Sequence, residues 1–222
     1  MDRKIGQQVF EATYGCPSPT VADLSRGEAR AGAYHFEYSR DQPGHPAEGG
    51  CVRFGWSEQG LYAVAEFEDS HRVALNRKDE QLHYKYGDVF ELFIKPRDED
   101  YYWEMYAIPS GNKTTLFFPR DRDGMTVEQH LRDHSFHGLE VSAEETSKGW
   151  NARMFVPASQ LTALGAGWGD DTPWTIFCGR YNYNSDDLKN PELSMAPPLS
   201  ATNYHLTQEY AELCFLESCL NN

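Results

Sequence analysis

The chain has 222 residues, 14% of them aromatic, with 18 glycines, 12 prolines and a formal net charge of −14 at pH 7. This composition favours short strands and many turns over long helices. The negative charge argues against nucleic acids and anionic membranes as partners.

Ten segments combine β-branched and aromatic residues with turn residues at their ends, which indicates short strands. Pro157 begins a single predicted helical turn over 157–161. The polar or proline-rich stretches 39–50, 70–83, 120–138 and 185–202 are expected to be loops. We therefore expect an all-β fold, an antiparallel β-sandwich of about nine or ten strands with short helical turns, in one domain over residues 1–222. The ten strand segments are 7–12, 51–56, 61–68, 89–94, 101–108, 113–119, 139–146, 149–156, 174–183 and 211–216.

Cysteine usage and the lack of targeting segments indicate the compartment. The five cysteines are an odd number without a CxxC pair, so neither a disulfide framework nor a zinc ribbon is predicted. No apolar run resembles a signal peptide or reaches transmembrane length. As written, the sequence predicts a soluble cytoplasmic protein, or an extracellular one if a leader has been removed.

The stretch 84–108 organises the rest of the chain. Side chains alternate along a strand, so Val89, Glu91 and Phe93 share one face of segment 89–94, and the opposite face is apolar. Two largely apolar faces are typical of a central strand. Glu91 is the exception, because a carboxylate there needs a cationic or hydrogen-bonding partner or must stay near water.

Further polar residues lie on the neighbouring segments. Glu104 shares a face with Tyr102 and Tyr106, and rings beside acids can stack on a sugar and accept hydrogen bonds from its hydroxyls. A buried glutamate paired with an arginine is the alternative interpretation. Arg180 and Asn182 lie on an otherwise apolar strand face. We expect them to meet Glu91 across a concave face, directly or through a ligand.

Metal and catalytic motifs are weak. His130, His134 and His137 would lie on one side of a helix, but their segment has no helical pattern and favours a solvated loop. Asp121 and Asp123 resemble a fragment of a calcium loop that lacks its bidentate glutamate. The sequence has no GxSxG, Walker or HExxH motif, so no catalytic residue is assigned.

The order of the motifs resembles that of family 9 carbohydrate-binding modules, within the wider DOMON-like group. The resemblance implies a β-sandwich whose concave site grips the end of a sugar chain. In that family two tryptophans sandwich the sugar, while acids, an arginine and an amide bind its hydroxyls, and calcium occurs in some members. The resembling segments are 61–69, 87–94, 101–105, 148–161, 174–181 and 204–215.

Carried over by position, the resemblance assigns several binding residues. Asp69 and Glu91 match the sugar-binding acids, and Asn182 or Arg180 lies near the amide position. The first tryptophan is absent before Asp88, where Tyr84 or Tyr86 could stack instead.

Two further positions depart from the family pattern. The second tryptophan is absent near Met195, and the family arginine falls at Glu104, which reverses its charge. Glu104 is kept among the expected ligand-binding residues.

The expected function is non-catalytic binding of a small saccharide or a polysaccharide chain end, with no cofactor required and calcium left open. A haem-binding DOMON-like electron-transfer domain is an alternative, with axial ligands drawn from Met105, Met154, Met195 and His205. A glycoside-active enzyme that uses Glu91 and Glu104 is a third interpretation.

Overall fold

The ten predicted strands are all present in the computed structural model, which describes residues 8–15, 32–119, 124–169 and 172–216. The expectation of an all-β fold is therefore confirmed. These strands are β1 (Val9–Tyr14), β3 (Gly50–Ser57), β4 (Gly60–Glu68), β5 (Val89–Pro96), β6 (Tyr102–Ala107), β7 (Lys113–Phe118), β8 (Glu140–Glu145), β9 (Gly149–Pro157), β10 (Trp174–Asn182) and β12 (Ala211–Leu216).

Two strands and a helix lie where the sequence predicted none. Strands β2 (Tyr34–His35) and β11 (Glu192–Ala196) pair with β3 and β10, and β11 falls inside the predicted loop 185–202. Helix α1 (Val127–Asp133) lies in the predicted loop 120–138. It begins with a capping box, in which the Thr126 side chain accepts from the Gln129 N–H and the Gln129 side chain accepts from the Thr126 N–H.

The remaining helical elements are short. They are α2 (Ala158–Leu161), at the predicted helical turn, and the 3-10 turns η2 (His83–Lys85) and η3 (Thr207–Glu209). No helix in the described ranges is long and apolar enough to cross a membrane.

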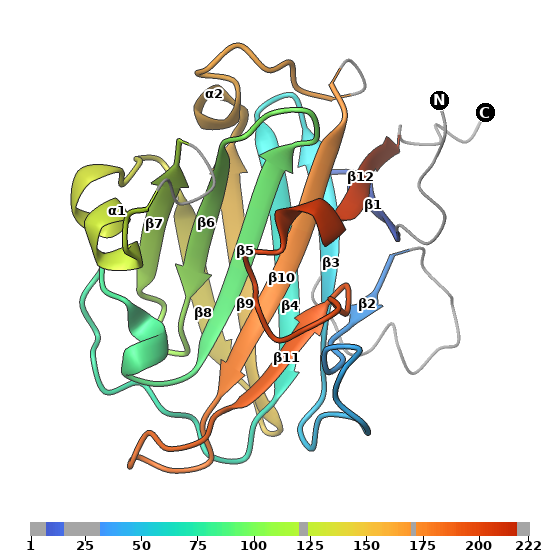
Figure 1. Ribbon diagram of the computed structural model, residues 1–222. Helices are drawn as coiled ribbons and strands as arrows, with labels where there is room; N and C mark the ends of the chain where they lie inside the picture. The colour runs from blue at the N-terminus through green and yellow to red at the C-terminus, as the bar shows by residue number, and fades with distance from the viewer. Residues whose placement is uncertain (1–7, 16–31, 120–123, 170–171, 217–222) are drawn as a thin grey trace.

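The twelve strands form one hydrogen-bonded sheet in the order β7-β6-β5-β10-β12-β1-β3-β4-β9-β8, with β11 on β10 and β2 on β3. The sheet folds over, so that β10, β5 and β6 lie in front of β3, β4 and β9 (Figure 1). Strand β1 pairs in parallel with both β12 and β3. The expectation of an antiparallel arrangement is therefore wrong at β1, although the other strand pairs are antiparallel.

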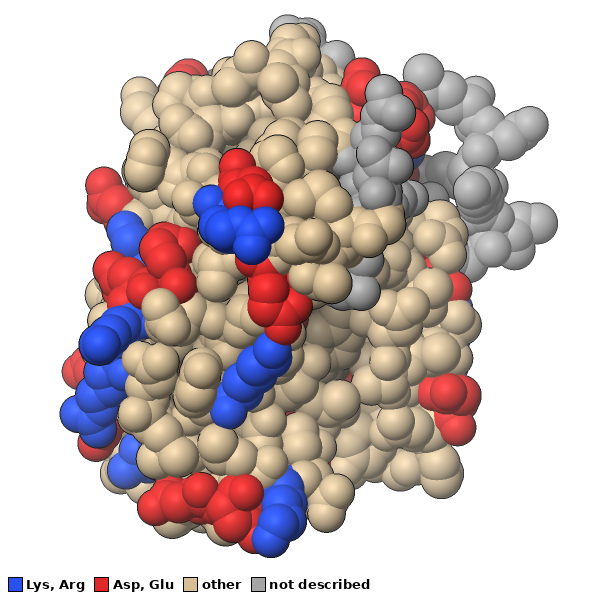
Figure 2. Space-filling model, turned by 60° about the vertical axis from the view of Figure 1, so that its left-hand side comes forward, with Lys and Arg blue, Asp and Glu red and all other residues tan. Residues whose placement is uncertain are grey.

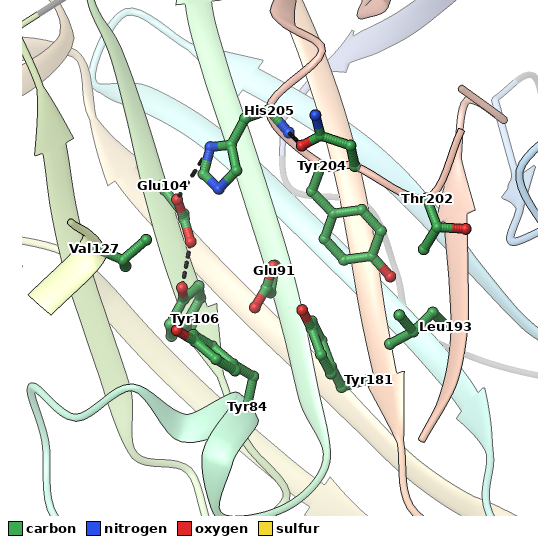
Figure 3. A pocket seen from close by; sticks show the side chains of 11 residues that line it. Tyr84, Glu91, Glu104, Tyr106, Val127, Tyr181, Leu193, Thr202, Tyr204 and His205 are labelled. Carbon is green, nitrogen blue, oxygen red and sulfur yellow. Dashed lines mark hydrogen bonds and ion pairs between the residues drawn. The ribbon is translucent and has the colours of Figure 1, made fainter. Parts of the chain in front are cut away.

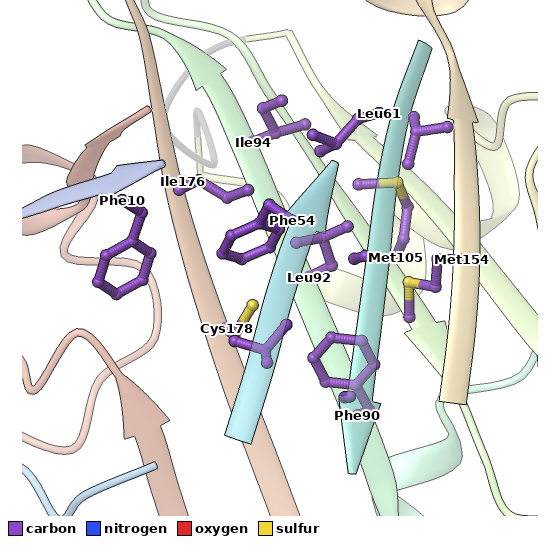
Figure 4. Close-up of a cluster of buried hydrophobic side chains, with 14 of the residues drawn as sticks. Phe10, Phe54, Leu61, Phe90, Leu92, Ile94, Met105, Met154, Ile176 and Cys178 are labelled. Carbon is purple, nitrogen blue, oxygen red and sulfur yellow. The ribbon is translucent and has the colours of Figure 1, made fainter. Parts of the chain in front are cut away.

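Strand β5 is buried on both faces, as its sequence predicted. Phe90, Leu92 and Ile94 point into the larger apolar cluster between the two layers (Figure 4). Val89 and Phe93 point the other way, into a second cluster that covers the outer face. This second cluster also contains Tyr102, Tyr106, Phe177, Leu199, Tyr204 and Tyr210. Glu91 shares the outer face with it and so lies beneath the segment that carries Tyr204.

Gly87 fixes the entry of the chain into β5. Its φ of +149° is rarely adopted by L residues, and an added Cβ would overlap the Val73 carbonyl oxygen. The next residue, Asp88, donates its N–H to that same oxygen at 2.8 Å. The close approach of two backbone segments therefore requires glycine at this position.

We expect Gly87→Ala to lower the free energy of unfolding by about 2 to 4 kcal/mol, because it combines backbone strain with overpacking. Chemical denaturation measures the change. Gly44→Ala is the matched control, since Gly44 also has a positive φ but has nothing within 4 Å of the added Cβ. Equal losses in the two variants would contradict a steric role for Gly87.

Candidate functional site

A pocket of about 230 Å³ lies on the outer face of β5, β6 and β10, under the segment that follows β11 (Figure 3). Its walls come from elements far apart in the sequence, including η2 and α1. The lining residues are Tyr84, Glu91, Glu104, Tyr106, Val127, Tyr181, Leu193, Thr202, Asn203, Tyr204 and His205.

Strand register places Glu91 at the floor of this pocket. Glu91 is paired with Tyr106 on β6 and with Gly179 on β10. Because Gly179 has no side chain, the ring of Tyr204 lies against its Cα, where an added Cβ would overlap that ring. The glycine thus allows the segment that follows β11, called here the late segment, to pack on the sheet beside Glu91.

Tyr204 is held firmly in this position. Its hydroxyl group donates to the carbonyl oxygen of Arg180 at 2.9 Å or to that of Ser194 at 3.0 Å. Its own carbonyl oxygen accepts a 2.7 Å hydrogen bond from the Tyr210 hydroxyl. The pocket wall formed by this segment is therefore anchored to both β10 and β11.

Four tyrosine rings surround the carboxylate of Glu91 (Figure 3). The ring centroids of Tyr84 and Tyr106 are 6.3 Å apart, and those of Tyr84 and Tyr181 are 5.4 Å apart. Tyr181 and Tyr204 meet edge to face at 5.7 Å. These contacts order the rings into a continuous aromatic wall.

The two pocket acids have different surroundings, although each is only 2% exposed. Glu104 accepts a hydrogen bond from the Tyr106 hydroxyl and lies 4.0 Å from Nδ1 of His205. That nitrogen also lies 2.9 Å from the Tyr102 hydroxyl. Glu91 Oε1 is buried and has no hydrogen-bond partner in the described part of the chain. An unsatisfied buried carboxylate oxygen that faces a pocket is a ready acceptor for a ligand.

Burial changes the titration of this site. Loss of solvent raises the pKa of Glu91 well above its usual value, and the neighbouring Glu104 raises it further. Burial also raises the pKa of Tyr106, with Glu104 and Glu91 adding to the effect. Glu91 therefore holds its proton to higher pH than an ordinary glutamate, and the tyrosine hydroxyl stays protonated as a hydrogen-bond donor.

The structure brings together three of the predicted site residues: Tyr84, Glu91 and Glu104. Tyr86 is 39% exposed and does not line the pocket. The prediction that Arg180 and Asn182 meet Glu91 is wrong. Arg180 is paired with Phe90, so its side chain points to the opposite face of the sheet from Glu91.

Arg180 instead lies at the centre of a second, buried polar cluster. Its guanidinium donates to the carbonyl oxygens of Glu48, Gly49 and Glu68 at 2.9, 3.2 and 2.6 Å. It also donates to Oδ1 of Asn182 at 2.9 Å. Asp69, the other predicted acid, lies 3.8 Å from Arg180 and is just as buried. The three residues therefore stabilise the junction of β4 and β10, away from the pocket.

Asp88 completes this cluster from the start of β5. Its carboxylate accepts from the backbone N–H groups of Val73 at 2.5 Å and Tyr183 at 2.6 Å. Burial, with a further contribution from the nearby Asp69, raises the pKa of Asp88 to about 8. Burial likewise raises the pKa of Asp69, although Arg180 opposes the change.

Sequence reasoning missed several lining residues as site residues. Alternation placed Tyr106 on the same strand face as Glu104, but Tyr106 was not named among the binding residues. Tyr181 needs the register of β10 against β5, which no local pattern gives. Tyr204 and His205 are brought in by the fold of the late segment, for which the sequence carries no local signal beyond Gly179.

The metal and haem candidates are not gathered into one centre. In the described residues no group of three or more His, Cys, Asp or Glu side chains is arranged to hold a metal ion. His130 is buried in α1 against Phe118, so its segment is not the solvated loop that was expected. Asp121 and Asp123 lie outside the described residues.

The candidate haem ligands are distributed between the two clusters. Met105 and Met154 lie in the core between the layers. Met195 lies in the outer cluster, where its sulfur accepts from the Leu199 N–H, and His205 lines the pocket.

Comparisons with solved structures identify the fold. A candidate carbohydrate-binding protein from Bacteroides uniformis ATCC 8492 matches 95% of this chain and 100% of its own, with a TM-score of 0.66 and 12% identity. A family 9 carbohydrate-binding module from Caldicellulosiruptor kristjanssonii, solved with cellotriose, matches 96% of each chain with a TM-score of 0.62 and 12% identity. The same kind of module from that organism, solved with glucose, gives a TM-score of 0.62 and 12% identity over 97% of this chain and 99% of that one.

These likenesses confirm that the fold resembles that of family 9 carbohydrate-binding modules. No protein-family model matches the sequence, and no curated protein matches it.

We expect wild-type stability to fall by about 3 kcal/mol between about pH 5.5 and pH 8 from the Asp88 proton. The pKa of Asp88 is about 8 in the folded protein and near 3.8 in an unfolded chain, so between these values the folded state holds the extra proton. Stability therefore falls as pH rises through this window.

Asp69→Asn removes a negative charge beside Asp88, so we expect a smaller pH dependence in that variant. Denaturant unfolding at several pH values measures the slope. Asp98→Asn, at a side chain that is 74% exposed, is the control and should keep the wild-type slope. An unchanged slope in Asp69→Asn would contradict the coupling of the two acids.

Proposed function

We propose that this protein is a non-catalytic carbohydrate-binding domain, with a β-sandwich architecture, that holds one sugar ring or a chain end in the pocket above Glu91. The observation that carries the proposal is the buried Oε1 of Glu91, which has no hydrogen-bond partner among the described residues and faces a pocket walled by tyrosines. Sugar hydroxyls can donate to that carboxylate while a ring face packs against an aromatic side chain. The proposal requires no cofactor.

The pocket dimensions favour a small ligand. Its volume of about 230 Å³ lies below the roughly 300 to 1,000 Å³ of sites for drug-sized molecules. A single ring, free or at a chain end, suits this space better than a polysaccharide bound along its length. The likeness in fold to modules solved with glucose and with cellotriose supports the same class of ligand.

Tyr181→Ala should weaken glucose or cellotriose binding about five- to tenfold, because an aromatic contact contributes about 1 kcal/mol or more. Isothermal titration calorimetry measures the affinity. Tyr62→Ala is the matched control, since Tyr62 packs on Phe155 in the other layer, outside this pocket. Equal effects of both variants, with thermal melts confirming that they are folded, would count against this pocket as the site.

One observation favours a glycosidase as the second candidate, namely that two carboxyl groups, Glu91 and Glu104, line a single pocket. Under our proposal, chromogenic glycosides stay intact after long incubation with the protein. Hydrolysis that is lost in both Glu91→Gln and Glu104→Gln would replace the binding proposal by an enzymatic one. Absorbance of the released chromophore measures hydrolysis. Glu144→Gln, on the exposed face of β8, is the control variant.

A further inference from the structure

Acidic side chains outnumber basic ones in the lining of the pocket. Glu91 and Glu104 are both buried in it, and within the described part of the chain neither lysine nor arginine lines it. The remaining titratable groups that face Glu91 are four tyrosines and one histidine, and α1 adds only the apolar Val127. These groups are Tyr84 from η2, Tyr106 from β6, Tyr181 from β10, and Tyr204 and His205 from the late segment.

The basic side chains near the pocket are engaged elsewhere. Lys85 follows Tyr84 in the chain but forms a salt bridge with Glu128 of α1 at the surface. On the face shown in Figure 2, several of the basic side chains likewise lie next to acidic ones. Arg180, which is buried one residue away from Gly179, points to the other side of the sheet.

His205 can balance one acid at most. Its Nδ1 lies 4.0 Å from Glu104, so a protonated His205 would neutralise that carboxylate. Glu91 has no such neighbour, and its Oε1 has no hydrogen-bond partner among the described residues. An ionised Glu91 would then be an uncompensated buried charge, which is strongly unfavourable in a site with little solvent.

A neutral sugar cannot compensate the charge of an ionised Glu91, whereas a protonated amine neutralises it. An ammonium group gains a charge-assisted hydrogen bond to the carboxylate and also interacts favourably with tyrosine ring faces. The side chains that surround Glu91 supply both types of contact.

We infer that the saccharide bound here is an amino sugar, a ring with a protonated amino group that Glu91 receives. This inference rests on the proposed function, because it names the class of sugar that the same pocket selects. Burial raises the pKa of Glu91, so we expect binding of the ammonium group to displace a proton from this carboxyl group to solvent.

The test compares glucosamine with glucose and with N-acetylglucosamine, which lacks the basic amine. Calorimetry is run at about pH 6.5, below the usual pKa of an α-amine, in buffers with different enthalpies of ionisation. We expect glucosamine to bind about tenfold more tightly than either neutral sugar, because hydrogen bonds to charged groups are stronger than neutral ones. The buffer dependence should show proton release with glucosamine only.

Glu91→Gln keeps the shape of the side chain but cannot become charged. In this variant the affinity ratio of glucosamine to glucose should fall towards one, and the proton release should disappear. Glu144→Gln on β8 is the matched control and should keep the wild-type ratio. The wild-type comparison of ligands remains decisive if Glu91→Gln does not fold.

The outcomes separate this inference from the proposed function. Glucose binding as tightly as glucosamine, without proton release, would overturn the amino-sugar inference and leave carbohydrate binding in place. Tetramethylammonium binding as tightly as glucosamine would also overturn it, because the site would then recognise a cation without its sugar. Binding of none of the three sugars would overturn both proposals.

Discussion

The burial of strand β5 on both faces is the constraint on which the candidate site depends. All eight residues of β5 are buried, and one of them is a glutamate on the outer face. The outer aromatic cluster removes this face from solvent, but it leaves a pocket above the carboxylate. If the outer face were fully packed, the Glu91 carboxylate would be buried without access for a ligand. If the face were open, water would solvate the carboxylate. The outer cluster covers the face only partly, and this leaves Glu91 accessible to a ligand.

The partial cover depends on a single contact between distant parts of the chain. Tyr204 lies over Gly179 and is fixed by hydrogen bonds to β10 and β11. This arrangement explains why β11 matters despite its short length, since it supplies the Ser194 carbonyl and the wall residue Leu193. The geometry of the site is thus a consequence of tertiary packing around Tyr204, rather than of a local motif.

The sequence predicted those features of the site that depend only on residues close together in the chain. Alternation placed Glu91 and Glu104 correctly, because a strand with a period of two assigns faces without knowledge of the fold. It could not place Arg180, because a shift of one residue in register between β5 and β10 moves a side chain to the other face. Helix α1 was missed although its Thr126 and Gln129 form a recognisable capping box, so that error was avoidable.

The distribution of buried charge shows how the two polar clusters differ. At the end of β10 that faces β4, the buried Arg180 lies 3.8 Å from Asp69 and makes four hydrogen bonds from its guanidinium. On the opposite face, one position from Arg180 along the strand pairing, Glu91 has no comparable partner among the described residues. Since the cation and the pocket acid are separated by the sheet itself, neither can satisfy the other. Asp88 has its hydrogen-bond donors built into the fold, from the N–H groups of Val73 and Tyr183. Glu91 Oε1 has no such donor among the described residues and faces a pocket, so this carboxyl group is suited to receive a ligand.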